Sequence, residues 1–149
     1  MSMVTEIGHG LSGLEQLRAF IAAGKRPGIA VSLDFDLVEV GDGTAVFAGL
    51  PGPHAYNPMG AVHGGYFATL LDSACGCAVH SKLTAQQGYT TLELKVAFHK
   101  PITSETGRVR AEGRVVTIGR RVAFADANLV DSNGRLYASA TSTLLVMER

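Results

Sequence analysis

One carboxylate stands alone in the stretch NPMGAVHGGYFATLLDSA, residues 57–74. Asp72 is the only Asp, Glu, Lys or Arg between Val62 and Ser81. A carboxylate among small and apolar neighbours is partly desolvated, which is the usual condition for a catalytic base or nucleophile. Asp72 is therefore predicted to do chemistry rather than to solvate the surface of a helix.

His63, Gly64 and Gly65 stand where this stretch becomes helical. The first N–H groups of a helix lack partners and lie at the positive end of its dipole, so they bind an oxyanion or a polarised carbonyl. Glycines let such a ligand approach the backbone closely. Each residue also has an ordinary explanation, since a glycine pair permits a tight loop, a histidine caps a helix and Asn57 suits a turn. Their combination with Asp72 predicts a site.

The residues around Asp72 fall on two faces when the stretch is drawn as an α-helix. One face is an apolar stripe with i, i+3, i+4 spacing, expected to bury against a sheet. The stripe consists of Phe67, Leu70, Leu71, Ala74, Cys75 and Ala78. The flank that carries Asp72 is otherwise small or apolar and consists of Gly65, Ala68, Gly76 and Val79. Small residues suit close approach of another backbone, so we expect this flank to meet a second copy of the helix.

Gly64 and Asp72 are too far apart to act on one atom within one chain. Eight residues of α-helix span roughly 12 Å along the axis. A carbonyl bound at the Gly64 amide would therefore meet Asp72 only from an antiparallel partner helix across a two-fold axis. This geometry predicts a homodimer with two equivalent sites, each shared between the subunits.

The elements that must position these residues follow the order helix, two strands, central helix, four strands. Within residues 12–23, apolar side chains recur at helical spacing after a serine that can cap the helix, and Gly24 ends the run. Six runs with alternating or turn-bounded patterns are predicted as strands. These runs are Ile29–Val40, Thr44–Leu50, Gly88 to Pro101, Arg108–Ile118, Val122–Val130 and Leu136–Val146. Short connections favour antiparallel neighbours, so we predict an α+β domain with one antiparallel sheet wrapped around one helix.

Composition narrows the class of protein. A chain of 149 residues, 46% hydrophobic, suffices for one globular domain. Thirteen basic and thirteen acidic residues cancel, which argues against nucleic acid or a membrane surface as partner. Charged residues make up only 17%, which favours an oligomer that hides part of its surface. No secretion signal or transmembrane run is visible, and Cys75 and Cys77 fit a reducing cytoplasm, so a cytoplasmic location is expected.

Asn57, five further residues, His63-Gly64-Gly65 and then Asp72 resemble the motif of the hotdog-fold acyl-CoA thioesterases of the phenylacetate-degradation (PaaI-like) group. A Thr-bearing strand and the closing strand GRLYASATSTLLV extend the resemblance over about residues 28–147. The resemblance implies a single hotdog domain at 28–149, behind an N-terminal helical extension at 1–27. It also implies hydrolysis of acyl-CoA to free acid and CoA without a cofactor, by a homodimer or a dimer-of-dimers tetramer.

The same resemblance assigns roles to single residues. The Gly64 N–H would polarise the thioester carbonyl, and Asp72 of the opposite subunit would act as nucleophile or general base. Asn57 would position water or the carbonyl, and His63 would support the carbonyl site or the leaving thiol. A Thr on the next strand would assist the acid or the water. Thr91 matches best by its distance from the end of that strand, and Thr90 stays open.

The substrate has two parts with different needs. The acyl group is expected in an apolar tunnel at the dimer interface, with Phe67, Leu71 and Phe98 as candidate walls. The phosphates of CoA would favour basic side chains near the mouth. The candidates are Arg120, Arg121 and Lys100.

Rival chemistries lack their motifs. The histidines show no zinc-ligand spacing, and Cys75-Gly76-Cys77 on an apolar helix is interpreted as packing rather than as a redox pair. No G-x-S-x-G elbow, P-loop or G-x-G-x-x-G is present. Two alternatives stay open on the same fold, an enoyl- or hydroxyacyl-CoA dehydratase and a non-catalytic acyl-CoA binding module.

Overall fold

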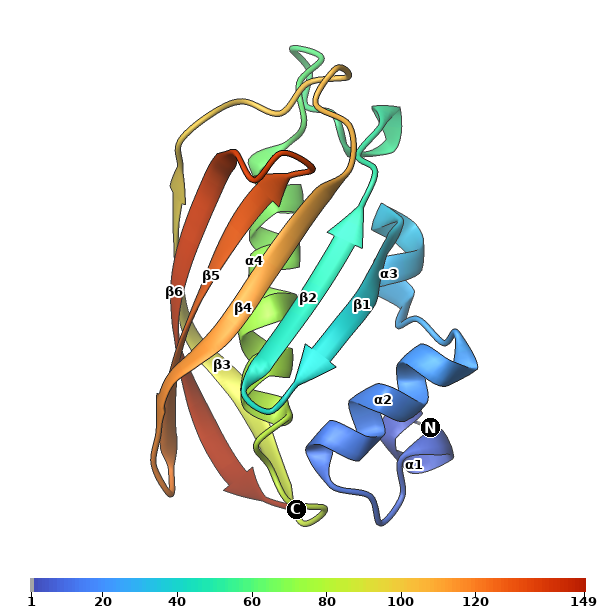
Figure 1. Cartoon of the computed structure of the whole chain (residues 1–149), viewed down its shortest axis with the longest axis vertical. Helices are drawn as coiled ribbons and strands as arrows, with labels where there is room; N and C mark the ends of the chain where they lie inside the picture. The colour runs from blue at the N-terminus through green and yellow to red at the C-terminus, as the bar shows by residue number, and fades with distance from the viewer. Residues whose placement is uncertain (1) are drawn as a thin grey trace.

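Six antiparallel strands form one curved sheet in the computed structural model, which describes residues 2–149 (Figure 1). The strands are β1 (Phe35–Gly41), β2 (Thr44–Gly49), β3 (Gln87–Phe98), β4 (Val109–Ile118), β5 (Val122–Asp131) and β6 (Leu136–Glu148). Their order across the sheet is β1-β2-β4-β5-β6-β3. β3 therefore lies at an edge and pairs with β6 alone among the described strands.

A central helix, α4 (Gly64–His80), packs along the concave face of this sheet and contacts all six strands (Figure 1). The whole apolar stripe predicted for it is buried, with Leu70, Leu71 and Ala74 completely inaccessible. The predicted α+β architecture is thus confirmed. Burial of this stripe is the main reason why a helix with so little surface charge is stable here.

The sheet meets α4 with unusually small side chains. Its buried inner residues include Ala111, Ala123, Ala125, Ala127, Ala138 and Ala140. At Gly113 of β4 the approach is closer still, because a Cβ there would overlap the carbonyl group of Ala74 in α4. Small residues therefore let the strands curl tightly around the helix at normal packing density.

Three short helices precede the sheet (Figure 1). They are α1 (Met3–Ile7), α2 (Gly13–Ala23) and α3 (Gly28–Leu33). α2 and α3 pack beside β1, and α1 packs against α2. α2 confirms the helix expected at 12–23. Ser12 and Glu15 form a reciprocal capping box at its start, and Gly24 ends it in the left-handed region with φ 62°.

The buried side chain of Gln16 ties α2 to the end of α4. Its Nε2 donates to the carbonyl oxygens of Gly8 and Leu11 at 3.1 and 3.0 Å. Its Oε1 therefore faces His80, whose Nε2–H donates to it at 2.7 Å. Burial of His80 lowers its pKa to about 4, so this histidine is neutral in the folded protein near pH 7.

The strands agree with the predicted runs to within three residues, except for the first. The expected strand Ile29–Val40 is wrong in its first half, where α3 forms, and β1 begins only at Phe35. The carbonyl of Pro27 accepts the N–H groups of Ala30 and Val31 at 3.0 and 3.1 Å, which starts a helical turn. Asp34, with φ 55°, then ends that helix in the left-handed region.

Candidate active site

The N-terminus of α4 presents one free backbone donor. His63 is the N-cap, and its Nδ1 accepts the Gly65 N–H at 2.7 Å. The His63 carbonyl accepts the Tyr66 N–H at 3.0 Å. The Gly64 N–H has no acceptor within residues 2–149, and it lies in the first turn, where the helix dipole is positive. It is therefore the group available to a bound carbonyl oxygen, while His63 serves as a helix cap.

A cavity of about 430 Å³ opens beside Gly64. It brings together three residues predicted for the site, Asn57, Gly64 and Lys100, the last of which comes from a distant part of the chain. Its other walls are mainly apolar and include Met59, Ala61, Val62, Phe67, Phe98 and Pro101. Gly64 thus borders a space with mainly apolar walls and a few polar groups, which is the usual lining of a small-molecule site.

Asn57 shapes the loop that forms one wall of this cavity. Its Oδ1 accepts the N–H groups of Met59 and Ala61 at 2.9 and 3.2 Å, so the carboxamide oxygen is used in folding the loop. The side-chain oxygen of Asn57 therefore has the role of a turn residue, as the ordinary explanation for Asn57 expected. Only its amide Nδ2–H₂ remains for the positioning role that the resemblance implies.

Phe98, at the end of β3, lies directly against Gly64. A Cβ on Gly64 would come within 3.1 Å of the Phe98 ring. The same ring packs edge-to-face on Phe67, with centroids 5.4 Å apart. Phe98 is 56% exposed even so, which leaves it free to turn aside. The two rings form an aromatic wall next to the free amide, in line with the tunnel predicted from Phe67 and Phe98. Leu71, the third candidate wall, is completely buried in the core under the sheet.

Asp72 is half-buried and has one hydrogen-bonded side-chain neighbour. The Thr91 hydroxyl of β3 donates to Asp72 Oδ1 at 3.0 Å. A β-bulge follows Thr91, which pairs with Leu144 of β6 while Glu93 pairs with the adjacent Thr143. Thr90 is exposed on the opposite face of the strand. Of the two threonines left open by the sequence, the structure brings Thr91 to the carboxylate.

The cysteines and the tyrosine near Asp72 all have raised pKa values. Burial raises the pKa of Cys75 and of Cys77 to about 12, and the charge of Asp72 adds to both shifts. Burial and the same charge also raise the pKa of the Tyr89 hydroxyl. Both cysteines are free thiols and remain protonated at neutral pH, which agrees with the packing interpretation.

The small flank of α4 is only partly open. A Cβ on Gly76 would overlap the Tyr89 hydroxyl, so Tyr89 of β3 already fills the space beside this glycine. Val79 is also completely buried within the chain. The expectation that this flank meets a second helix is therefore wrong for Gly76 and Val79. Gly65, Ala68 and Asp72 keep accessible surface, so the prediction stands for them.

Tyr89 is a neighbour of the site that the sequence analysis missed. It lies two residues before Thr91 on β3, and side chains two apart on a strand share a face. Its spacing of two residues from Thr91 is the sequence signal that could have placed Tyr89 beside α4.

The predicted basic residues separate in the structure. Lys100 lines the cavity at Gly64. Arg120 and Arg121 lie in the hairpin between β4 and β5, at the opposite end of the sheet within one chain (Figure 1). The structure thus brings one of the three candidate cations to the site.

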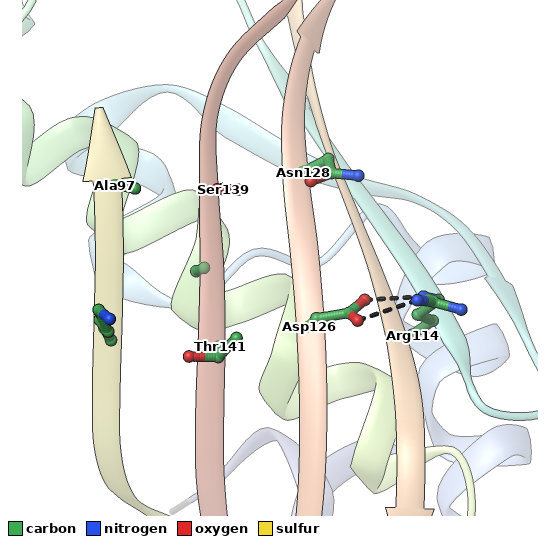
Figure 2. Close-up of a pocket in the computed structure, with 8 residues that line it drawn as sticks. Ala97, Arg114, Asp126, Asn128, Ser139 and Thr141 are labelled. Atoms are coloured by element: carbon green, nitrogen blue, oxygen red, sulfur yellow. Dashed lines mark hydrogen bonds and ion pairs between the residues drawn. The ribbon is translucent and has the colours of Figure 1, made fainter. Parts of the chain in front are cut away.

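A second hollow, of about 440 Å³, lies on the outer face of the sheet (Figure 2). There Arg114 of β4 donates two hydrogen bonds to the Asp126 carboxylate of β5, at 2.8 and 3.0 Å. The polar residues that line it on β5 and β6, such as Asn128 and Thr141, alternate with the buried alanines that face α4, of which Ala140 also borders the hollow. The sheet therefore separates this hollow from Gly64 and Asp72.

Within residues 2–149 no three His, Cys, Asp or Glu side chains are arranged to hold a metal ion. Likewise, no helix of the described chain has the length and hydropathy needed to cross a membrane.

Comparison with known proteins identifies the family of this chain. The family model described as Thioesterase superfamily matches residues 59–138. A relative from Saccharolobus solfataricus, named as an inferred esterase, is 34% identical over 87 residues, which cover 58% of this chain and 56% of that protein. The chain thus spans about half the length of the curated relatives it matches.

Solved structures extend the likeness to nearly the whole chain. A thioesterase family protein from Silicibacter pomeroyi is 26% identical, with a TM-score of 0.80 over 93% of this chain and 100% of that one. A phenylacetic acid degradation-related protein from Ralstonia eutropha JMP134, named as an inferred thioesterase, is also 26% identical. Its TM-score is 0.75 over 85% of this chain and 96% of that one. The hotdog architecture expected from the resemblance is confirmed by these neighbours.

Proposed function

The chain belongs to the thioesterase superfamily, and from this we propose that it hydrolyses acyl-CoA thioesters to a free carboxylic acid and CoA. The observation that carries the proposal is the free N–H of Gly64 at the start of α4, in a residue that lines a cavity with mainly apolar walls. A preorganised donor of this kind stabilises the oxyanion that forms when a thioester carbonyl is attacked.

Asp72 supplies the second half of the chemistry. In one version its carboxylate attacks the carbonyl carbon, the C–S bond breaks, and water then hydrolyses the resulting anhydride. In the other version the carboxylate takes a proton from water, which attacks the carbonyl directly. Both versions end with a carboxylic acid and the CoA thiol. The Thr91 hydroxyl holds Asp72 in place in either case, since it donates to Oδ1 at 3.0 Å.

The site is completed by a second subunit. Gly64 and Asp72 are separated by eight residues of α4, roughly 12 Å along its axis, so one thioester cannot touch both in the same chain. An antiparallel α4 from a partner would bring the partner's Asp72 opposite Gly64. The accessible Gly65, Ala68 and Asp72 support such an approach, and the unpaired edge of β3 offers further surface. We infer a homodimer with two shared sites, or a dimer-of-dimers tetramer.

The remaining assignments rest on the same site. Lys100 is the candidate for a CoA phosphate from the chain that holds Gly64, and Arg120 and Arg121 are candidates only from another subunit. Phe67 and Phe98 would contact the acyl group. The reaction needs no cofactor. Free thiols at Cys75 and Cys77 support a cytoplasmic location.

A panel of acyl-CoA substrates, with Asp72→Asn measured beside the wild type, tests the proposal. Release of free thiol by the wild type, lost in the variant, is the expected result. Addition of water to an enoyl-CoA without thiol release would indicate a dehydratase instead. Tight acyl-CoA binding without turnover would indicate a binding module.

A further inference from the structure

A hollow of about 350 Å³ lies next to the cavity at Gly64, and the two spaces share Lys100 and Pro101 as lining residues. We propose that this hollow binds the phosphates of CoA and that Arg135, which also lines it, is the residue that recognises them. The assignment rests on the proposed function. It makes Arg135 the side chain that favours CoA thioesters over thioesters without phosphate.

The fold brings Lys100 and Arg135 to one rim although they are distant in sequence. The connection after β3 and the hairpin between β5 and β6 lie at the same end of the sheet as the start of α4 (Figure 1). The carbonyl oxygen of Tyr137 in β6 accepts the N–H groups of His99 and Lys100 at 2.8 and 3.1 Å. Arg135 lies two residues before Tyr137, at the end of the hairpin.

The hairpin that carries Arg135 is folded around the carboxylate of Asp131. Its Oδ1 accepts the N–H groups of Asn133 and Arg135 at 2.9 and 3.0 Å. Its Oδ2 accepts the Tyr137 hydroxyl at 3.2 Å. Asp131 itself does not line the hollow. The turn therefore fixes the backbone of Arg135 and leaves its exposed guanidinium available to a ligand.

The groups that line the hollow are mainly hydrogen-bond donors. The Lys100 ammonium and the Arg135 guanidinium are exposed and form no ion pair within residues 2–149. Thr106 Oγ1 accepts the Thr103 N–H at 3.0 Å, and Thr103 Oγ1 accepts the Glu105 N–H at 3.3 Å. Each of these hydroxyl groups can still donate its own proton.

Glu105 is the only carboxylate among the described residues that line the hollow. Two cations and two hydroxyl donors thus face one acidic group. Such a set fits a ligand that carries several acceptor oxygens and negative charge, which describes a phosphate. The shared Lys100 and Pro101 indicate which phosphate this is, because a ligand whose thioester lies at Gly64 can extend directly into the hollow.

Calorimetric titration of CoA into the full-length protein tests the site without turnover. Arg135→Gln should weaken CoA binding by about tenfold or more, because a hydrogen bond to a charged group is lost. The variant should fold normally, since the turn uses only the backbone of Arg135. Glu105→Gln removes the opposing charge and should tighten CoA binding. Arg18→Gln is the matched control, because it replaces an exposed arginine on α2 and should leave CoA binding unchanged.

Kinetics with two substrates add a second readout. Acyl-pantetheine presents the same thioester arm without the phosphates of the nucleotide. Arg135→Gln should lower kcat/KM for acyl-CoA by about tenfold and leave kcat/KM for acyl-pantetheine unchanged. An equal loss with both substrates would mean that Arg135 does not act on the phosphates.

Three binding results would overturn the proposal. These are unchanged CoA binding in Arg135→Gln, equal weakening by Arg135→Gln and Arg18→Gln, and an effect of Arg135→Gln on inorganic phosphate alone. The last result would show an anion site unrelated to CoA. If CoA binding responds as expected but no acyl-CoA is hydrolysed, the proposed function fails and the phosphate site stands. Hydrolysis with unchanged CoA binding in Arg135→Gln would show the reverse.

Discussion

Replacing Gly64 by proline removes the one backbone donor on which the proposed chemistry depends. Proline lacks an N–H and is well tolerated at the first position of a helix, which is where Gly64 stands. The residue before a proline must be extended, and His63 already is, with φ −64° and ψ 138°. No hydrogen bond within residues 2–149 is lost, because the Gly64 N–H makes none.

The rate and the stability should therefore respond in opposite ways. Loss of one oxyanion donor lowers kcat by a factor of about 100 to 1,000, which corresponds to about 2.7–4 kcal/mol. The folded state should be unchanged or more stable by about 0.4–1 kcal/mol, since proline restricts the unfolded chain. Gly64→Ala is the matched control. It adds the same Cβ, about 3.1 Å from the Phe98 ring, but keeps the N–H.

The assay is release of CoA thiol from an acyl-CoA under saturating substrate, alongside urea unfolding of each variant. Gly64→Ala should keep most of the wild-type kcat, and Gly64→Pro should lose it at equal stability. Equal activity of the two variants would refute the role of the amide. If Gly64→Ala and Gly64→Pro lose kcat equally, the loss comes from the contact between the added Cβ and Phe98. In that case Phe98→Ala combined with Gly64→Ala should restore turnover.

Four further predictions follow from the same contacts. Asp72→Asn keeps the shape of the side chain and should lower turnover by about a hundredfold or more, with stability kept or raised; a variant that loses stability but keeps its rate per folded molecule would show a structural Asp. Thr91→Val removes the hydroxyl that donates to Asp72 and should lower kcat by about tenfold, whereas Thr90→Val on the exposed face should not, as steady-state kinetics would show. Mixing Asp72→Asn with Gly64→Pro subunits should restore about half of the wild-type activity per mixed dimer, because one of its two sites carries neither substitution. If mass spectrometry shows that subunits have exchanged and activity does not recover, the two residues do not meet across an interface. His80 has a pKa of about 4 in the folded protein and 6.5 in the unfolded chain, so protonation favours the unfolded chain. The free energy of unfolding should therefore fall as the pH drops from 6.5 towards 4, by at most about 3 kcal/mol. Urea unfolding at each pH measures this dependence, and His80→Gln should lose it.

The central helix was predictable because its information is local. The apolar stripe, the glycines at its start and the isolated Asp72 all lie within seventeen consecutive residues, so helical periodicity alone places them relative to one another. The separation of Gly64 from Asp72 follows from the same periodicity. The strands were predictable for a similar reason, since alternation and turn residues mark them.

What depends on distant contacts could not be predicted in this way. The smallness of Gly76 reflects Tyr89, thirteen residues further on, and not a partner helix. The Asn57 oxygen is consumed by its own loop, which spacing within a motif does not reveal. At residues 28–33 the β-branched Ile29 and Val31 favour a strand locally, but the turn that starts at Pro27 prevails.

The β-bulge after Thr91 determines how the candidate site would respond to an insertion or deletion in β3. Before the bulge the odd-numbered Tyr89 and Thr91 face α4, and after it the even-numbered Leu94, Val96 and Phe98 do, opposite Ser142, Ala140 and Ala138 of β6. A regular strand would send Thr91 and Phe98 to opposite sides of the sheet. One supernumerary residue, Leu92, thus resets the phase of β3 so that a single strand serves both Asp72 and Gly64. Deleting Leu92, far more than replacing it, would therefore dismantle the candidate site while leaving every proposed catalytic residue in the sequence.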